Sequence, residues 1–400
     1  MKMNSPKIRF KGYTEDWEQR KLGEIITEYK ETVDSECTLP ILTSSKTEGV
    51  ILQEEHFGRK QQHDITGYNI LPRNYCTYRN RSDGVDFTFN INKCCDKGII
   101  SKFYPVFSGK NSDIFFLSLV LNNSDEVVRE IAYTCTGTGQ KVLSFLDLQK
   151  MKVRVPSYDE QKEIAAYFEN LDHLITLHQR KLEQTKTLKK YMLQKMFPQE
   201  GQKVPEIRFE GFTGDWEQRK LPEFVSFFNG LTYTPDDVEE TGTLVLRSSN
   251  VKNGEIVDAD NVYVNDKVVT SENVHEGDII VVVRNGSRAL IGKHAQIKAS
   301  MPNTVIGAFM SGMRSEHSSF VNALLDTSAF ENEIAKNMGA TINQITGYMF
   351  SKMEFMIPSG DEQQKIGEYF QSLDHLITLH QREYEKLQEL KKFMLQNMFV

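Results

Sequence analysis

The feature that most constrains this chain is an internal duplication. Residues 6–22 read PKIRFKGYTEDWEQRKL, and thirteen of these seventeen positions are identical in residues 205–221. A second pair, residues 159–197 and 361–399, is identical at twenty-five of thirty-nine positions. Repeats of this kind indicate one structural plan used more than once. The 400 residues therefore form two tandem halves, about 1–199 and 200–400, rather than several unrelated domains.

Each half contains a repeated opening segment, a long variable region and a repeated tail. The predicted boundaries place the opening segments at 1–22 and 199–221, the variable regions at 23–157 and 222–358, and the tails at 158–198 and 359–400. The variable regions share few residues, and one weak match sets Tyr78-Arg79-Asn80 beside Val283-Arg284-Asn285. We therefore expect two domains of one fold whose surfaces have diverged.

The tails are predicted to be long helices. Ser157 and Ser359 precede Glu160 and Glu362 at the spacing of a capping box, in which the serine accepts an amide hydrogen bond and the glutamate reaches back. Each helix would be roughly 57 Å long at 1.5 Å per residue. We expect the two to pack antiparallel as a coiled coil; the alternative is that each packs only on its own domain. The apolar residues that recur about every 3.5 positions are Ile164, Phe168, Leu171, Ile175, His178 and Leu182, then Ile366, Phe370, Leu373, Ile377, His380 and Tyr384.

The variable regions are predicted to be independent α+β domains. Residues 277–297 contain an apolar strand, the pair Asn285-Gly286 and a second strand, which indicates a hairpin with a tight turn. Residues 74–84 are a looser counterpart, and short helices are expected within 112–134 and 318–338. The predicted fold class is α+β: two such domains joined by two long antiparallel helices, with an internal pseudo-two-fold repeat.

No catalytic motif accompanies this organisation. The sequence contains no G-x-x-x-x-G-K-[ST] phosphate loop, no glycine fingerprint of a dinucleotide fold, no G-x-S-x-G elbow and no H-E-x-x-H helix. It also lacks the Asn/Asp-Pro-Pro-Tyr/Phe segment with which amino-methyltransferases hold a flipped base. Packing on helix faces, rather than metal binding, is expected for the repeated histidines His173, His178, His375 and His380. The chain is therefore predicted to be a binding protein without catalytic residues, metal or cofactor of its own.

Composition indicates a cytosolic protein. The chain is 39% hydrophobic, no run approaches the roughly 18 apolar residues of a membrane span, and the first residues lack a hydrophobic signal segment. The five cysteines are odd in number and lack metal-ligand spacing. This favours a reduced compartment and argues against structural zinc.

The net charge of −7 argues, by itself, against a nucleic-acid ligand. The charges are segregated, however. No acidic residue occurs from Ile279 to Ser315, where the basic residues are Arg284, Arg288, Lys293, Lys298 and Arg314. In the first variable region, nine basic residues outnumber four acidic ones between Arg59 and Lys110; they are Arg59, Lys60, Arg73, Arg79, Arg81, Lys93, Lys97, Lys102 and Lys110. Basic stretches at matching places predict two faces that contact DNA phosphates.

Two motifs, each present twice, resemble those of a known family. They are the opening motif P-x-I-R-F-x-G-[YF]-T-x-D-W-E-Q-R-K-L and the tail motif P-S-x-D-E-Q…L-D-H-L-I-T-L-H-Q-R. The whole chain is similar to the specificity subunits (HsdS) of type I restriction-modification systems, of the kind found in low-GC Gram-positive bacteria. The resemblance implies that the variable regions are target recognition domains, each reading one half of a bipartite double-stranded DNA sequence. It also implies that the helix pair sets the spacing between the half-sites.

The resemblance further implies partner subunits. Two methyltransferase (modification) subunits would dock on the helices, and two restriction/translocase subunits would complete a cytoplasmic adenine methyltransferase and ATP-dependent endonuclease complex that has no membrane partner. S-adenosylmethionine, ATP and Mg would be bound by those partners, which would account for the missing catalytic motifs.

The candidate DNA-binding residues lie in loops. Arginine and asparagine at a hairpin tip can make bidentate contacts with guanine and adenine, and two further loops, 139–141 and 341–344, precede the last strand of each domain. The candidates are Arg79, Asn80, Arg81, Gln140 and Lys141 in the first domain, and Arg284, Asn285, Ser287, Arg288, Lys293, Asn343 and Gln344 in the second. A phosphate contact or a surface salt bridge is the open alternative for each arginine. For the whole chain, two alternatives stay open: a coiled-coil adaptor whose domains do not bind DNA, and a self-sufficient enzyme that acts on DNA.

Overall fold

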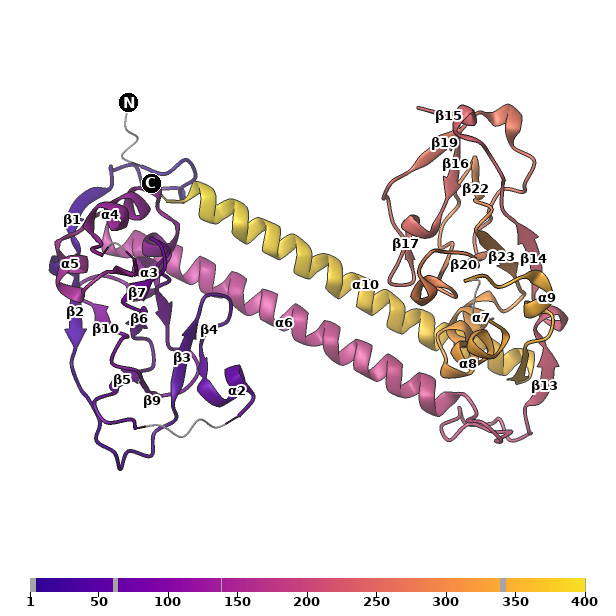
Figure 1. Ribbon diagram of the computed structural model, residues 1–400, viewed down its shortest axis with the longest axis horizontal. Helices are drawn as coiled ribbons and strands as arrows, with labels where there is room; N and C mark the ends of the chain where they lie inside the picture. Colours follow the sequence, from indigo (N-terminus) through magenta and orange to yellow (C-terminus); the bar gives the residue numbers. More distant parts are fainter. Residues whose placement is uncertain (1–4, 60–63, 138, 339–342, 400) are drawn as a thin grey trace. The chain divides into compact units, whose positions relative to one another are not determined.

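The computed structural model describes residues 5–59, 64–137, 139–338 and 343–399. The chain divides into two compact units, the first made of Met1–His178 with Glu383–Val400 and the second of Gln179–Arg382. Each unit contains one variable region, the first part of the long helix that follows it and the last part of the other long helix (Figure 1). The boundaries predicted for the six segments stay predictions.

In the first unit, the opening segment becomes a strand. β1 (Glu18–Lys21) pairs antiparallel with β12 (Lys152–Val155), which directly precedes the long helix. The main sheet has the strand order β2 (Ile26–Tyr29), β10 (Val106–Gly109), β6 (Cys76–Thr77) and β8 (Asn90–Ile91), and α3 (Ile114–Asn123) and α4 (Asp125–Thr134) follow β10 along the chain. The other elements are α1 (Leu22–Ile25), β3 (Leu42–Ser45), β4 (Gly49–Leu52), α2 (Gln53–Phe57), β5 (Asn69–Pro72), β7 (Arg81–Ser82), β9 (Lys97–Ile100), β11 (Lys141–Val142) and α5 (Phe145–Lys150).

The second unit repeats this plan. β13 (Glu217–Lys220) pairs with β24 (Glu354–Ile357), and the corresponding sheet has the order β14 (Ser226–Asn229), β23 (Met310–Arg314), β20 (Ile279–Val282) and β21 (His294–Gln296). A further sheet has the order β15 (Val238–Glu239), β19 (Val262–Val264), β16 (Thr243–Leu246) and β22 (Thr304–Ile306). The other elements are β17 (Val251–Lys252), β18 (Glu255–Ile256), α7 (Ser318–Leu325), α8 (Ser328–Asn337), α9 (Gly347–Phe350) and the 3-10 turns η1 (Leu221–Glu223), η2 (Pro235–Asp237), η3 (Ser248–Asn250), η4 (Asp266–Val268) and η5 (Arg288–Leu290).

The predicted α+β class is confirmed, and so are the short helices. Each predicted helical stretch is a pair of helices broken at a capping residue. Ser124 accepts the amide of Val127 at the start of α4, and Thr327 accepts the amide of Phe330 at the start of α8. A side-chain oxygen at this position satisfies one of the amides that the first helical turn leaves without a partner.

The two long helices are α6 (Tyr158–Met196), with 39 residues, and α10 (Gly360–Asn397), with 38 residues. Ser157 Oγ accepts the Glu160 amide at 3.4 Å, as predicted. The glutamate half of each capping box is wrong. The buried Glu160 carboxylate accepts two bonds from Arg9 (2.6 and 2.7 Å), because a guanidinium fork satisfies both oxygens at once.

The second opening segment is held in the same way. Arg208 donates to both oxygens of the buried Glu362, at 2.7 and 2.8 Å. At Ser359 no side-chain cap occurs within the described parts of the chain. Each opening segment is therefore fixed to the start of the helix that ends its own half.

Within each unit the two helices are antiparallel. In the first unit Lys391, near the end of α10, forms an ion pair with Asp172 in the first part of α6. In the second unit Lys189, near the end of α6, pairs with Asp374 in the first part of α10 at 2.6 Å. Each pair joins an early part of one helix to a late part of the other, which confirms the predicted direction.

The helix residues that recur about every 3.5 positions, here called seam residues, have two kinds of neighbours. The first three of each helix are buried in the core of their own domain, and Met398 in the first unit and Phe197 in the second join the same cores from the end of the other helix. Packing on the domain and packing between helices therefore both occur. Of the later seam residues, Leu182 is buried, whereas Ile175, His178, Ile377, His380 and Tyr384 are half-buried.

The opening segments also supply a tryptophan to each core. Trp17 and Trp216 are both 2% exposed. The Trp17 ring lies 5.7 Å from Phe116, and the Trp216 ring lies 5.9 Å from Phe197, measured between ring centroids. The two tryptophans of the sequence thus report on different units.

The structure also tests what the sequence predicted about membrane spans, cysteines and the helix histidines. Across the described ranges, no helix is long and apolar enough to cross a membrane. All five cysteines are free thiols. The prediction that the helix histidines pack is wrong for His173 and His375, which are exposed.

Candidate nucleic-acid interface

In the second variable region, the chain beyond β20 leaves the sheet and contacts two other segments. The amides of Val283 and Arg284 both donate to the carbonyl oxygen of Phe309, at 3.0 and 3.2 Å. The amide of Ile345 donates to the Val283 carbonyl at 2.8 Å, and Arg284 forms an antiparallel bridge with Gln344. The structure therefore joins two candidate loops that are far apart in the sequence.

This arrangement replaces the predicted tight turn. β20 and β21 do pair as a hairpin, but the connection runs from Val283 to Lys293 and includes η5. The Asn285 side chain accepts the amide of Ser287 at 3.0 Å and donates to Ser248 Oγ at 3.1 Å. The predicted turn at Asn285 is wrong because the chain beyond β20 finds backbone partners outside the hairpin.

The first variable region has the same three-segment arrangement. The amide of Asn80 donates to the Phe103 carbonyl at 2.9 Å, and the amide of Leu143 donates to the Asn80 carbonyl at 3.0 Å. The next residue, Arg81, lies opposite Val142 in the ladder between β7 and β11. Two of the hydrogen bonds around Val283 thus recur around Asn80, and Arg81 faces Val142 as Arg284 faces Gln344.

The hydrogen bonds correct the alignment of the two regions. The weak sequence match equated Arg79 with Arg284, whereas the backbone contacts equate Arg81 with Arg284. The predicted hairpin over 74–84 is also wrong, because β6 pairs with β8 and β10 while β7 pairs with β11. Between β6 and β7, Tyr78 enters the core and its hydroxyl donates to the Leu143 carbonyl at 3.0 Å. Because the Tyr78 ring is buried in the core, the chain does not form the predicted turn at this position.

Both equivalent arginines lie over an exposed aromatic ring. The guanidinium carbon of Arg81 is 4.6 Å from the centroid of Phe103, and that of Arg284 is 5.0 Å from Phe309. The two phenylalanines are 38% and 55% exposed. Over the part of the chain that the structure describes, neither guanidinium has an ion pair or a side-chain hydrogen bond, so its donors face solvent.

Phe103 and Phe309 were not among the residues predicted from the sequence to bind DNA. Phenylalanine is ordinarily a core residue, and both lie shortly before strands of the main sheets, β10 and β23, so that nothing local distinguishes them from core residues. A single sequence gives no sign that these two rings are exposed.

The other candidates divide into loop-stabilising and exposed side chains. Lys141 Nζ donates to the Gly137 carbonyl at 2.8 Å, Lys293 Nζ to the Ser248 carbonyl at 3.3 Å, and Asn343 Nδ2 to the Gly286 carbonyl at 3.0 Å. Asn80 and Gln344 are half-buried. The exposed candidates are Arg79, Gln140, Ser287 and Arg288. Of the predicted loop 341–344, Thr341 and Ile342 lie outside the described residues.

The basic stretches are less uniform than their sequences suggested. In the second region, Arg314 pairs with Asp278 at 2.9 Å and Lys298 pairs with Glu255. In the first, three members pair with carboxylates: Arg73 with Asp96, Lys93 with Glu169 and Lys97 with Glu31. The prediction that whole stretches form basic faces is therefore wrong for these residues, because folding brings distant acids beside them. Lys60 lies outside the described residues.

Comparison with protein families gives one decisive match. The family described as the type I restriction modification DNA specificity domain matches residues 14–187 and again residues 213–389. The chain belongs to this family. Its role is DNA sequence specificity, and each match contains one complete variable region.

Similar proteins agree with this assignment, and a solved structure agrees with the fold. The specificity subunit is 24% identical over 313 residues to the type I restriction enzyme MjaVIII specificity subunit of Methanocaldococcus jannaschii, covering 74% of this chain and 72% of that protein. It is 26% identical to the EcoKI specificity subunit of Escherichia coli over 188 residues, which cover 44% of this chain and 40% of that protein. The crystal structure of the S subunit from M. genitalium matches with a TM-score of 0.65 at 14% identity and covers 99% of both chains. At this identity the structural match supports the fold alone.

The specificity subunit also exposes apolar side chains on its helices. Leu188 and Tyr191 on α6 are 44% and 49% exposed. Leu390 and Phe393, at the corresponding places on α10, are 40% and 53% exposed. Large apolar side chains that face water at repeated positions often mark an interaction surface.

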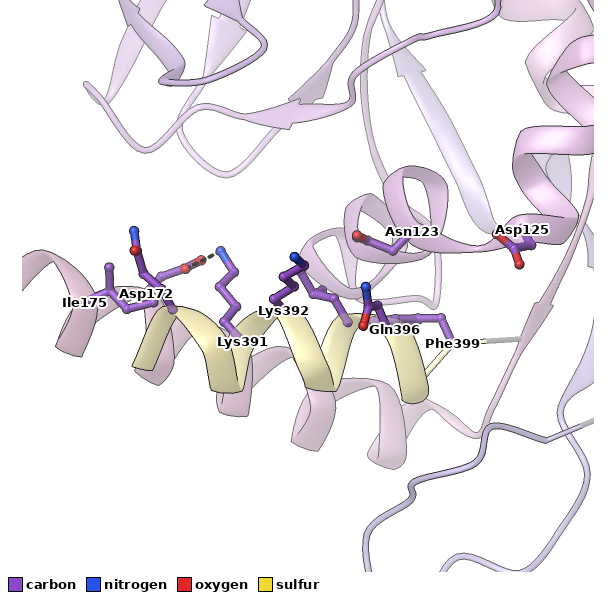
Figure 2. Close-up of a pocket in the computed structure, with 10 residues that line it drawn as sticks. Asn123, Asp125, Asp172, Ile175, Lys391, Lys392, Gln396 and Phe399 are labelled. Atoms are coloured by element: carbon purple, nitrogen blue, oxygen red, sulfur yellow. Dashed lines mark hydrogen bonds and ion pairs between the residues drawn. The ribbon is translucent and has the colours of Figure 1, made fainter. Parts of the chain in front are cut away.

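The first unit of the specificity subunit has a cavity where the second unit has a cluster of charged side chains. The cavity has a volume of about 640 Å3 and is lined by Asn123 and Asp125 on one side and by Lys391, which faces Asp172, on the other (Figure 2). Its lining carries both signs of charge. No group of three metal-ligating side chains occurs among the residues described.

In the second unit, a charged cluster occupies the equivalent place. Asp326, like Asn123, directly precedes a helix cap; it pairs with Lys189 at 2.6 Å and with the buried His294 at 3.4 Å. Burial disfavours the charged imidazole, but the Asp326 hydrogen bond and charge outweigh it, so the pKa of His294 is raised. Although burial alone would raise it, the pKa of Asp326 is held well below its usual range by His294 and Lys189.

Proposed function

We propose that this specificity subunit directs a type I restriction-modification complex to a bipartite DNA target, with one half-site recognised by each variable region. The observation that carries the proposal is the repeated arrangement in which Arg81 or Arg284 lies over an exposed phenylalanine. An arginine without a protein partner can donate to phosphates or to base edges. Two such sites in one chain fit a target with two separate parts.

The long helices are proposed to set the distance between the half-sites. Each helix has residues in both units, so a change in its length changes the chain that connects them. Half-sites one helical turn apart on DNA are separated by roughly 34 Å. Helices of roughly 57 Å can span that distance and leave their ends for other contacts.

The exposed apolar pairs on the helices are proposed to dock the methyltransferase subunits. Leu188 with Tyr191, and Leu390 with Phe393, would each receive one copy, which accounts for two copies in the complex. Two restriction/translocase subunits would then join the methyltransferase subunits. In this proposal S-adenosylmethionine, ATP and Mg are bound by the partners, and the complex acts in the bacterial cytoplasm.

Methylation mapping tests the main proposal. Genomic DNA from cells with and without this chain is sequenced for methylated adenine in the presence of the methyltransferase subunit. We expect a split motif that disappears without the chain. An unchanged methylation pattern, together with no salt-dependent band shift by the chain and its methyltransferase, would favour the adaptor without DNA binding. Cleavage or methylation by the purified chain alone would favour the self-sufficient enzyme.

The spacing role has a separate test. Adding four residues, about one turn, to one long helix should change the number of base pairs accepted between the half-sites. The matched control is the same insertion after Gly201, which lies outside both helices. If the helix insertion leaves the spacer unchanged in a complex that still methylates, the helices do not set the spacing.

Docking is tested with charged substitutions. Tyr191→Glu and Phe393→Glu should each reduce the methyltransferase subunits that co-purify from two to one. Tyr133→Glu is the control, because Tyr133 is 87% exposed but lies on α4 of the first variable region. Full recovery of both subunits with the two helix variants would place the docking surface elsewhere.

A further inference from the structure

We infer that Arg81 and Arg284 are the equivalent specificity-determining residues of the two variable regions, and that each recognises a guanine. In this inference Phe103 and Phe309 orient the guanidinium groups before DNA arrives. The inference rests on the proposed function and adds to it the residue, the base and the orienting ring.

The first argument is the equivalence of the two sites. The variable regions share few residues, yet at one position defined by backbone hydrogen bonds both have an arginine. The carbonyl that accepts the bond from the preceding residue belongs in each case to an exposed phenylalanine, Phe103 or Phe309. The same pair of side chains thus occurs twice on the same local backbone.

The second argument is that three other arginines of the variable regions already bind carboxylates. Arg73 donates to Asp96 at 2.7 Å, Arg247 to Asp260 at 2.6 Å and Arg314 to Asp278 at 2.9 Å. A carboxylate at this distance uses the donors that a base edge would need. As far as the structure describes the chain, Arg81 and Arg284 have no such carboxylate partner, and each guanidinium lies over an aromatic ring.

The third argument concerns what the ring does. A guanidinium is planar and stacks on aromatic faces, while its N–H donors point outward in the plane. Contact with Phe103 or Phe309 restricts the rotamers of a long side chain, so less conformational freedom is lost on binding. An exposed phenylalanine supplies no hydrogen bond itself, which makes an orienting role the better use of its position.

Guanine is the base that fits this group. Its N7 and O6 are two acceptors on one edge in the major groove, and arginine can donate to both. A phosphate contact needs only the positive charge and gives no sequence preference. Arg→Lys substitution separates the two, because lysine keeps the charge and loses the fork.

The experiment uses the full chain with its methyltransferase subunits and measures methylation of DNA pools randomised at each position of both half-sites. We expect Arg284→Lys to lower the preference for one G·C pair in one half-site by about 10- to 100-fold. Arg81→Lys should do the same in the other half-site only. Phe309→Leu should weaken the same position as Arg284→Lys, by a smaller factor.

Matched controls are Arg20→Lys and Arg219→Lys, which lie at corresponding places in the two opening segments and pair with Glu24 and Glu223. Both should leave every position unchanged. Fluorescence of Trp216, which is buried in the second unit, checks that Phe309→Leu still folds.

Several results would overturn the inference. If Arg284→Lys lowers methylation equally on all sequences, or the affected pair is not G·C, the arginine does not recognise guanine. If neither substitution changes any position, these arginines are not specificity-determining. A wild-type complex that shows no bipartite sequence requirement would instead contradict the proposed function, so the two failures are distinguishable.

Discussion

The pair of Arg208 and Glu362 allows a quantitative test of how the second opening segment is held on α10. The Glu362 side chain is 1% exposed and that of Arg208 is 16% exposed, and two hydrogen bonds of 2.7 and 2.8 Å join them. Glu362→Gln removes the charge and turns an amide NH2 toward the guanidinium donors. Breaking a buried ion pair from one side costs about 3–5 kcal/mol. This is a large part of the roughly 5–15 kcal/mol that stabilises a typical domain.

The two tryptophans make the assay specific to one unit. In a Trp17→Phe background, Trp216 fluorescence follows unfolding of the second unit in urea, because Trp216 is 2% exposed in that core. With slopes of about 2–3 kcal/mol per molar urea, Glu362→Gln should lower the midpoint by about 1–2 M. Glu368→Gln is the control on the exposed side of the same helix and should shift the free energy of unfolding by less than about 0.5 kcal/mol.

The first unit offers the mirror experiment. Glu160→Gln, followed by Trp17 in a Trp216→Phe background, should produce a similar shift, because Arg9 holds Glu160 with the same geometry. Equal midpoints for Glu362→Gln and its control would refute the reasoning. So would a Glu362→Gln shift that Trp17 reports in a Trp216→Phe background but that Trp216 does not report in the Trp17→Phe background.

The remaining predictions concern single contacts. His294→Gln should remove a pH dependence from the stability of the second unit. Because the pKa of His294 is raised on folding, its contribution to stability is complete below about pH 6.5 and is lost as the pH rises through the folded-state pKa. In urea unfolding, wild type should therefore lose more stability than the variant between pH 6 and pH 9. Gly367→Ala should destabilise the second unit by about 1–3 kcal/mol in the same assay, because a Cβ there would lie 2.7 Å from the Phe320 amide; a neutral result would show that α7 moves away readily. Tyr78→Phe removes a buried hydrogen bond and should cost about 1–3 kcal/mol in the Trp17 signal, and no change would mean that water replaces the hydroxyl.

Local signals in the sequence predicted the long helices and the two-part organisation. Apolar residues every three or four positions and the cap at Ser157 depend on neighbours within one or two turns, and both α6 and the duplicated α10 follow them. The mixed domains and their short helices were predicted for the same reason. Where a local signal had a stronger distant partner, it failed: Glu160 binds Arg9, which lies 151 residues away in the sequence.

The candidate site was predicted only in part, because its geometry depends on segments far apart in the chain. Arg284 and Gln344 were both candidates, but their contact comes from a backbone bridge that no local pattern specifies. The correct counterpart of Arg284 follows from the partner of Asn80, not from similarity of neighbouring letters. Charge counting failed in the same way, since Glu255 neutralises Lys298 only after folding.

Each unit has the same backbone hydrogen bond between an opening segment and the last turns of a long helix, but the length of chain between the two bonded residues differs. In the second unit the amide of Ile207 donates to the Lys195 carbonyl at 2.9 Å, and only a short linker separates them in the chain. In the first unit the amide of Ile8 makes the same bond with Asn397 at 3.0 Å, across almost the whole sequence. The bond therefore does not depend on chain continuity: the first unit combines segments from opposite ends of the sequence, whereas the second unit is one continuous stretch. We expect a nick in the linker before Ile207 to leave the fold assembled, and either half to be exchangeable for another that has the same opening segment and tail.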